Sequence, residues 1–202
     1  LRLLLVLTVC DIRAVGPNVW NGWKAALLRQ LYNAAERVMS GGTLSGGRIE
    51  RMKAVQAEVA RHLGSWTDAE KEEHFGRGYA PYWLSFPIDT LVRQAELVRR
   101  AERDKQPLAI EHRVQPDRSV TEITIYTLDT HGLFARLAGA MAISGANIVD
   151  AKIFTLANGM ALDTFWIQDL EGKPFDGPQR LARLAARVEI SLSNRLDIAR
   201  EL

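Results

Sequence analysis

One carboxylate, Asp11, stands in a run of apolar residues at the start of the chain and could take part in metal chemistry. Most side chains of residues 1–10 are apolar, so this run is predicted to lie in a core. A buried carboxylate costs free energy unless it is ion-paired, hydrogen-bonded or bound to a metal. Two interpretations remain open, a metal ligand and an ordinary core carboxylate that caps a helix or pairs with Arg13. Because no His-x-x-x-His, Cys-x-x-Cys or carboxylate cluster accompanies Asp11, we expect the other parts of any metal site to lie outside this chain.

A turn between a predicted strand and a predicted helix is the second candidate site, and its chemistry would be ligand binding. The turn contains Asp129, Thr130, His131, Gly132 and Leu133. Asp129 or Thr130 can cap the helix, and Gly132 lets the backbone approach a ligand closely. Free N–H groups at the start of a helix favour a carboxylate. The turn is therefore a candidate site for an amino-acid-sized ligand, with an ordinary capped turn as the alternative.

Asn147 and Ile148 begin the next predicted strand. In a split βαβ arrangement we expect Asn147 to lie beside the turn at residues 129–132, so that both segments would contact the same ligand. The two residues therefore complete the predicted binding site.

The remaining residues show no recognisable catalytic arrangement, and neither a Ser-His-Asp nor a Cys-His pattern is visible. The glycine-rich stretch 41–47 lacks the Lys-Ser/Thr pair of a phosphate loop and follows no predicted strand, so it is interpreted as a flexible break. Trp20 and Trp23 are expected to pack in a core. Four scattered histidines are expected on the surface: His62, His74, His112 and His131.

The composition is that of an ordinary globular protein. The chain has 202 residues, with 26 basic and 24 acidic side chains interleaved, and its net charge of +2 predicts neither a nucleic-acid nor a membrane partner. A single cysteine, Cys10, excludes an internal disulfide framework and fits a reducing compartment such as the cytoplasm. The first apolar run is too short to span a bilayer and lacks a basic leader, so a buried helix is favoured over a signal peptide.

Hydrophobic periodicity predicts that the first half of the chain is helical. We expect helices over residues 3–13, 20–39 and 49–63, a short helix that begins with a Thr67–Glu70 capping box, and a helix that starts near residues 85–87. From residue 108 the pattern becomes β-like. It predicts strands over 120–128, 147–157 and 160–168, with an Asn158-Gly159 hairpin, and helices over 132–144 and 181–192.

The predicted fold class is α+β, an all-helical N-terminal half followed by a truncated ferredoxin-like domain. The order strand-helix-strand-strand-helix is that of a split βαββαβ sheet without its last strand. A missing strand leaves an unpaired edge, which favours self-association with a second copy. Residues 108–114 offer an alternative, because they could fold back and cover an edge within one chain.

Several stretches resemble one family, the bifunctional PII uridylyltransferase/uridylyl-removing enzymes. Residues 3–24 resemble the end of that family's HD phosphohydrolase domain, and residues 121–140 and 147–153 resemble its first ACT domain. Tyr82-Trp-Leu-Ser-Phe-Pro87 and Leu162-Asp-Thr-Phe-Trp166 also match the family pattern. The resemblance covers nearly the whole chain. It implies three parts: residues 1–40 as the end of the HD domain, 41–106 as a helical linker and 107–202 as the first ACT domain without its last strand.

The resemblance also implies a function. The full-length enzyme would be cytoplasmic, would transfer UMP from UTP to the PII signalling protein and would remove it by hydrolysis, with Mg or Mn as the divalent metal. Asp11 would be the last Asp of the HD metal set, and the fragment alone is expected to be inactive. Glutamine, read by the ACT domain, would act as allosteric effector and favour removal. His131 stands where ACT turns often carry Pro.

Two other functions remain as alternatives. One is a free-standing amino-acid-binding ACT regulatory protein with a helical extension, which would have no need of a buried Asp11. The other is an interaction module without a small ligand. A titration with glutamine separates an amino-acid binder from such an interaction module.

Overall fold

The computed structural model describes residues 1–16, 20, 22–39 and 47–193. The first half contains the helices α1 (Arg2–Val15), α2 (Gly22–Met39), α3 (Arg48–His62), α4 (Asp68–Arg77), α5 (Ala80–Trp83) and α6 (Ile88–Arg103). The second half contains β1 (Leu108–Gln115), a short 3-10 turn η1 (Pro116–Arg118), β2 (Val120–Leu128), α7 (Leu133–Ile143), β3 (Asn147–Lys152), β4 (Met160–Gln168) and α8 (Pro178–Leu192). The predicted α+β class, with helices before a sheet, is confirmed.

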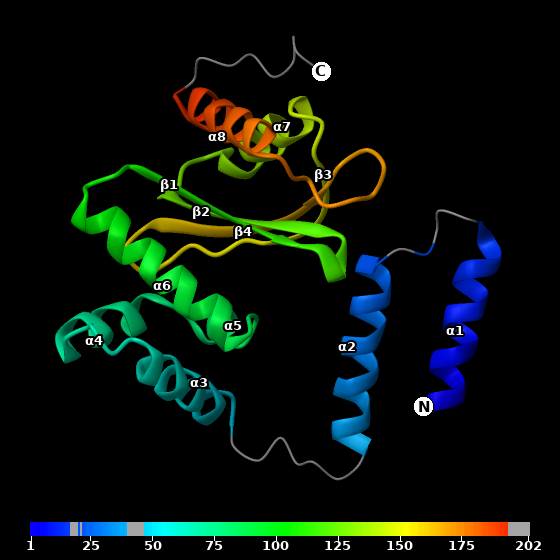
Figure 1. Cartoon of the computed structure of the whole chain (residues 1–202). Helices are drawn as coiled ribbons and strands as arrows, with labels where there is room; N and C mark the ends of the chain where they lie inside the picture. The colour runs from blue at the N-terminus through cyan, green and yellow to red at the C-terminus, as the bar shows by residue number, and fades with distance from the viewer. Residues whose placement is uncertain (17–19, 21, 40–46, 194–202) are drawn as a thin grey trace.

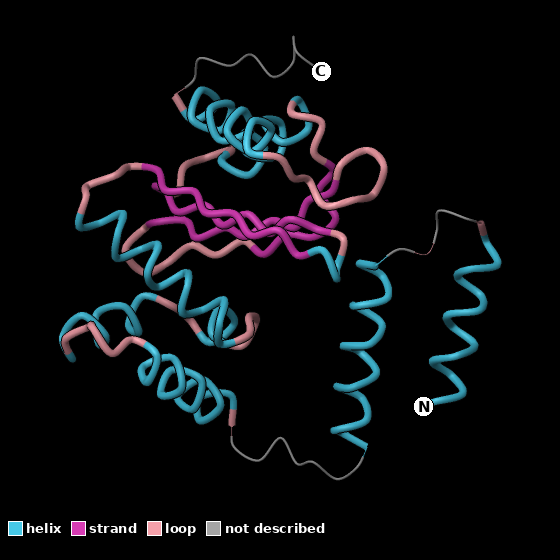
Figure 2. The backbone as a smooth tube through the Cα atoms, in the orientation of Figure 1, coloured by secondary structure: helices cyan, strands magenta, loops and turns pink. Residues whose placement is uncertain are grey.

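A four-stranded antiparallel sheet forms the middle layer of the molecule (Figure 1). Its strand order is β1-β2-β4-β3. Helices α7 and α8 cover one face, while α6 lies against the other face with α3, α4 and α5 beyond it (Figures 1 and 2). The arrangement is consistent with an ACT-like fold whose second face is covered by the preceding helices.

The sheet has four strands where the sequence predicted three main strands and an open edge. Strand β1 pairs with β2 along its whole length, from Leu108 opposite Thr127 to Gln115 opposite Val120. It therefore occupies the edge position beside β2 that was expected to be empty. The alternative that residues 108–114 fold back is confirmed, because antiparallel pairing satisfies the N–H and C=O groups that β2 would otherwise expose.

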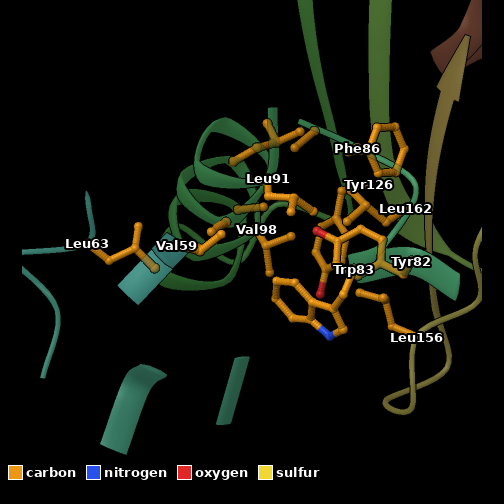
Figure 3. Close-up of a cluster of buried hydrophobic side chains, with 14 of the residues drawn as sticks. Val59, Leu63, Tyr82, Trp83, Phe86, Leu91, Val98, Tyr126, Leu156 and Leu162 are labelled. Carbon is orange, nitrogen blue, oxygen red and sulfur yellow. The ribbon is translucent and has the colours of Figure 1, made fainter. Parts of the chain in front are cut away.

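One hydrophobic core lies between the sheet and the helices that precede it. Trp83 and Leu91 from the helices are fully buried against Tyr126 and Leu162 of the sheet (Figure 3). A polar contact also joins this helical layer to the sheet: the buried Gln94 of α6 donates a hydrogen bond to Thr164 of β4 at 3.0 Å. Helices α3 to α6 thus share a continuous core with the sheet across the predicted boundary at residue 106.

A second core lies on the opposite face of the sheet. Ile125 of β2 and Phe165 of β4 are fully buried there beneath Leu137 of α7 and Val188 of α8. Alternate residues of β2 and β4 thus face the two cores, which is the period expected of a strand covered on both sides.

The predicted capping box and the predicted hairpin turn are both present, and a glycine also ends α7. Thr67 and Glu70 form the capping box at the start of α4. Gly145 follows α7 with a positive φ of 74°, and Gly159 closes the β-hairpin with a φ of 77°. A glycine adopts these left-handed conformations at little cost, because it has no Cβ.

The predicted burial of the first helix is wrong. Helix α1 forms over nearly the predicted range, but none of its residues is buried, and Leu3 is 80% exposed. Its principal neighbour in the described structure is α2, which lies along one side of it (Figure 1). Most of its apolar side chains are therefore exposed to solvent. Trp20 is partly buried, whereas the Trp23 side chain and residues 41–46 of the glycine-rich stretch lie outside the described structure.

Candidate functional site

The turn after β2 is held by hydrogen bonds on both sides. The Asp129 backbone N–H donates to the Gly159 carbonyl at 3.1 Å, and the Thr155 hydroxyl donates to the Asp129 carboxylate at 2.5 Å. Arg136 of α7 donates to the Thr130 hydroxyl at 2.6 Å. Neither Asp129 nor Thr130 caps α7, contrary to the prediction. Gly132 is the N-cap residue instead, because its φ of 75° makes the chain turn sharply into Leu133.

An open cavity of about 940 Å³ lies beside this turn. Thr130, His131 and Gly132 line it, as the sequence predicted for a ligand site. Two further lining residues carry opposite charges, Arg136 of α7 and Glu189 of α8. Sequence reasoning missed both. Arg136 follows Gly132 by one helical turn, which is a usable signal, whereas only the packing of α8 on α7 brings Glu189 to the turn.

The structure does not bring Asn147 and Ile148 to the turn of the same chain. Leu128, the last residue of β2, is opposite Met160 at the beginning of β4, whereas Asn147 is opposite Gln168 at the end of β4. Strands β2 and β3 are both antiparallel to β4 and therefore run parallel to each other. The end of one and the beginning of the other consequently lie at opposite ends of the sheet, and the expectation that they are adjacent is wrong.

Near the turn, β4 carries a buried carboxylate that the sequence did not single out. Asp163 is 1% exposed, and one of its oxygens accepts the Phe154 N–H at 3.2 Å. The other oxygen, Oδ2, has no hydrogen-bond partner among the described residues. Burial raises the pKa of Asp163 to about 6, opposed by the Phe154 hydrogen bond and assisted by the nearby charge of Asp129.

His74 is a second buried titratable group, in the helical layer, and its expected surface position is wrong. Its ring packs edge-on against Trp66, Phe75 and Trp83, and neither ring nitrogen has a hydrogen-bond partner among the described residues. Burial, together with a smaller effect of the Arg77 charge, lowers the pKa of His74 to about 4. The ring is thus a neutral core side chain at physiological pH.

The described residues do not by themselves form a metal site. Asp11 is exposed on α1, and within the described ranges no group of three or more His, Cys, Asp or Glu side chains could hold a metal ion. The assignment of Asp11 as a metal ligand stays a prediction. In the same part of the chain, none of the helices has the length and apolar character needed to cross a membrane.

The fold is a helical segment packed on an antiparallel sheet, and it is consistent with the class of ACT-like proteins. A cavity lies at the turn after β2. Comparison with known proteins then identifies the relatives. The chain is 53% identical over 97% of its length to a bifunctional uridylyltransferase/uridylyl-removing enzyme of Azospirillum brasilense. It is 47% identical over 98% of its length to the enzyme of that name from Gluconobacter oxydans, and 42% identical over 100% to that of Rhodospirillum rubrum.

The chain spans 21–22% of the length of these three curated relatives. It therefore corresponds to one segment of the bifunctional uridylyltransferase/uridylyl-removing enzymes, as the sequence resemblance predicted. No family model matches the chain.

Proposed function

We propose that this chain is the regulatory segment of an enzyme that attaches UMP from UTP to the PII signalling protein and removes it again in the cytoplasm. The similarity over 97% of the chain to an enzyme named for these two activities carries this proposal. The segment contributes the end of the hydrolytic HD domain and an ACT domain. Isolated from the rest of the enzyme, it is expected to catalyse neither reaction.

The cavity at the turn supports an amino-acid effector, and glutamine is the effector we propose. Arg136 can hold the carboxylate of a free amino acid, and Glu189 can hold its ammonium group. The N-terminus of α7 adds N–H groups that favour the same carboxylate. Thr130, His131 and Gly132 would thus form the wall against which the ligand lies, whereas the predicted site residues Asp129 and Leu133 do not line the cavity.

Asn147 and Ile148 can join this site through self-association. Strand β3 is at the edge of the sheet within the described residues. If two copies paired antiparallel through β3, the beginning of one β3 would lie beside the end of the other. That end of the sheet holds the turn, so Asn147 and Ile148 of one copy would approach residues 129–133 of its partner.

The proposed hydrolytic reaction needs a divalent metal, Mg or Mn, with Asp11 as one ligand. The described residues do not complete such a site, since no group of three or more His, Cys, Asp or Glu side chains among them could hold a metal ion. We therefore derive no chemical step from this segment, and the role proposed for Asp11 is limited to binding the metal together with groups outside it.

Calorimetric titration of the 202-residue chain with L-glutamine tests the effector site. We expect saturable binding that Arg136→Met weakens about tenfold or more, because a charge-assisted hydrogen bond is lost. Arg103→Met, which removes an exposed ion pair with Asp104, is the matched control and should leave binding unchanged. Equal affinity in the Arg136→Met and Arg103→Met variants would contradict the assignment of the cavity.

A further inference from the structure

A second cavity, of about 560 Å³, lies at the opposite end of the sheet from the turn at residues 129–132. It opens on the face of the sheet that α6 covers. Part of its wall is formed by Glu122 of β2 and Trp166 of β4, and these two residues are paired in the register of the sheet. Leu27 of α2 lines it from outside the sheet. Figure 1 shows α2 standing beside this end of the β1–β2 hairpin.

Three charged groups in the wall of this cavity, Asp89, Arg113 and Glu122, have partners of opposite charge. Arg113 donates to Asp89 at 2.9 Å, and Arg93 behind the wall donates to Glu122 at 2.7 Å. Gln115 also donates to Glu122, at 3.0 Å. These groups form a neutral, hydrogen-bonded frame.

Two charged residues of β3, Lys152 and Asp150, also line the cavity but do not take part in these ion pairs. The Lys152 ammonium lies 4.7 Å from the ring centroid of Phe86 and 5.4 Å from that of Trp166, and it donates to the Ser85 carbonyl. It forms no ion pair with any residue that the structure describes, although it is partly buried. Asp150, also partly buried, accepts the Ala151 N–H at 2.9 Å and likewise has no ion-pair partner within 4 Å in the described ranges, although its charge acts on Lys152 and on Arg118 of the same wall.

These two opposite charges lie on the same face of β3 and could together bind a zwitterion. Residues two apart in a strand point to the same face, with their Cα atoms about 6.5–7 Å apart. A group that offers a carboxylate to Lys152 and an ammonium to Asp150 would pair both charges at once. Partly buried ion pairs are screened less by salt than exposed ones, so these contacts would contribute more than surface pairs do.

We propose that this cavity binds a free α-amino acid, with its carboxylate on Lys152, its ammonium on Asp150 and its side chain toward Phe86 and Trp166. The site lies beyond the proposed function, because the turn that carries the glutamine proposal is at the other end of the sheet. Since Leu27 also lines the cavity, a bound amino acid would contact α2 and the sheet together. The ligand would therefore stabilise the position of α2 against the sheet.

The test is a thermal-shift screen of the 202-residue chain with the standard L-amino acids, followed by calorimetry with the strongest binders. We expect at least one amino acid to bind Arg136→Met with its affinity for the original chain, and to bind Lys152→Met and Asp150→Asn about tenfold or more weakly. The amide of that amino acid, which keeps the ammonium and lacks the carboxylate, should lose affinity to a similar extent.

Circular dichroism and the unfolding midpoint without ligand verify that each variant is folded. The proposal is overturned if no amino acid shifts the midpoint of the original chain. It is also overturned if every amino acid that binds does so equally well to Lys152→Met and Asp150→Asn. Binding that only Arg136→Met weakens would support the turn site and contradict this one, which keeps the two proposals distinguishable.

Discussion

Two buried titratable side chains, Asp163 and His74, link the stability of the protein to pH with opposite signs. The folded-state pKa of Asp163 is raised from 3.8 to about 6, so its protonated form is favoured in the folded chain. The folded-state pKa of His74 is lowered from 6.5 to about 4, so its neutral form is favoured. As pH falls, Asp163 stabilises the fold and His74 destabilises it.

Asp163→Asn should stabilise the protein at neutral pH. The stability that a protonated Asp163 contributes is fully present below pH 3.8 and is lost as pH rises through about 6. An amide of the same shape avoids the buried charge, so we expect a gain on the order of 2 kcal/mol in the free energy of unfolding above pH 6. Urea unfolding between pH 4 and 8 measures it, with Asp176→Asn at an exposed carboxylate as control. A gain that does not change with pH would contradict the account.

His74→Phe should remove part of the loss of folding stability that occurs at acid pH. The neutral ring is protonated more readily in the unfolded chain, so stability is lost as pH falls from 6.5 toward about 4. Phe keeps the aromatic packing, and we expect it to be more stable than the original chain by up to about 3 kcal/mol near pH 4, with a difference that is constant above pH 7. Unfolding curves in an Asp163→Asn background isolate this effect. A parallel pH dependence of both proteins would refute it.

Among the elements, those with a local signal could be predicted and those that depend on a distant partner could not. The Thr67–Glu70 capping box and the Asn158-Gly159 turn are formed by neighbours in the chain, and both are present in the structure. Strand β1 has a β-like composition, but only its pairing with β2 makes it part of the sheet. The burial of α1 was mispredicted because an apolar run does not reveal which surface, if any, covers it.

In the candidate site, too, residues that are neighbours in the chain could be predicted, and residues brought together by packing could not. Thr130, His131 and Gly132 follow one another in the chain and line one cavity, as expected. Asn147 was misplaced because strand direction decides which end of the sheet it occupies. Glu189 could not be found from the sequence, since it reaches the cavity only through the packing of α8.

Ile110→Pro tests the role of β1 as the fourth strand. Ile110 pairs with Ile125 in the middle of the ladder, where proline removes a donor and disturbs the pairing. We expect a loss of about 1–3 kcal/mol in the free energy of unfolding, because the fixed φ and the ring of proline disturb the pairing of β1 with β2. Sedimentation should also become dependent on concentration as the β2 edge is exposed. The control His112→Ala, at an exposed site of the same strand, should neither lower the stability nor change the sedimentation. If Ile110→Pro were monomeric and as stable as the original chain, the role of β1 as the fourth strand would be contradicted.

At the scale of the whole molecule, the helical layer and the sheet are one packed unit, with α1 and α2 beside it (Figure 1). Trp83 and Tyr126 belong to the same core although a predicted domain boundary separates them in the chain. A ligand at the sheet can therefore act on the helices through direct packing. This packing is the physical basis for the proposed connection between an effector site and an HD domain.

The most direct test of the central claim is made in the full-length enzyme with Asp11→Ala. If this chain is a segment of a bifunctional uridylyltransferase/uridylyl-removing enzyme and Asp11 binds the hydrolytic metal, release of UMP from modified PII should fall more than about 100-fold. Transfer of UMP from UTP to PII should continue, because Asp11 is assigned to the hydrolytic metal site alone. Unchanged release of UMP, or an equal fall of both activities in a folded enzyme, would contradict the account.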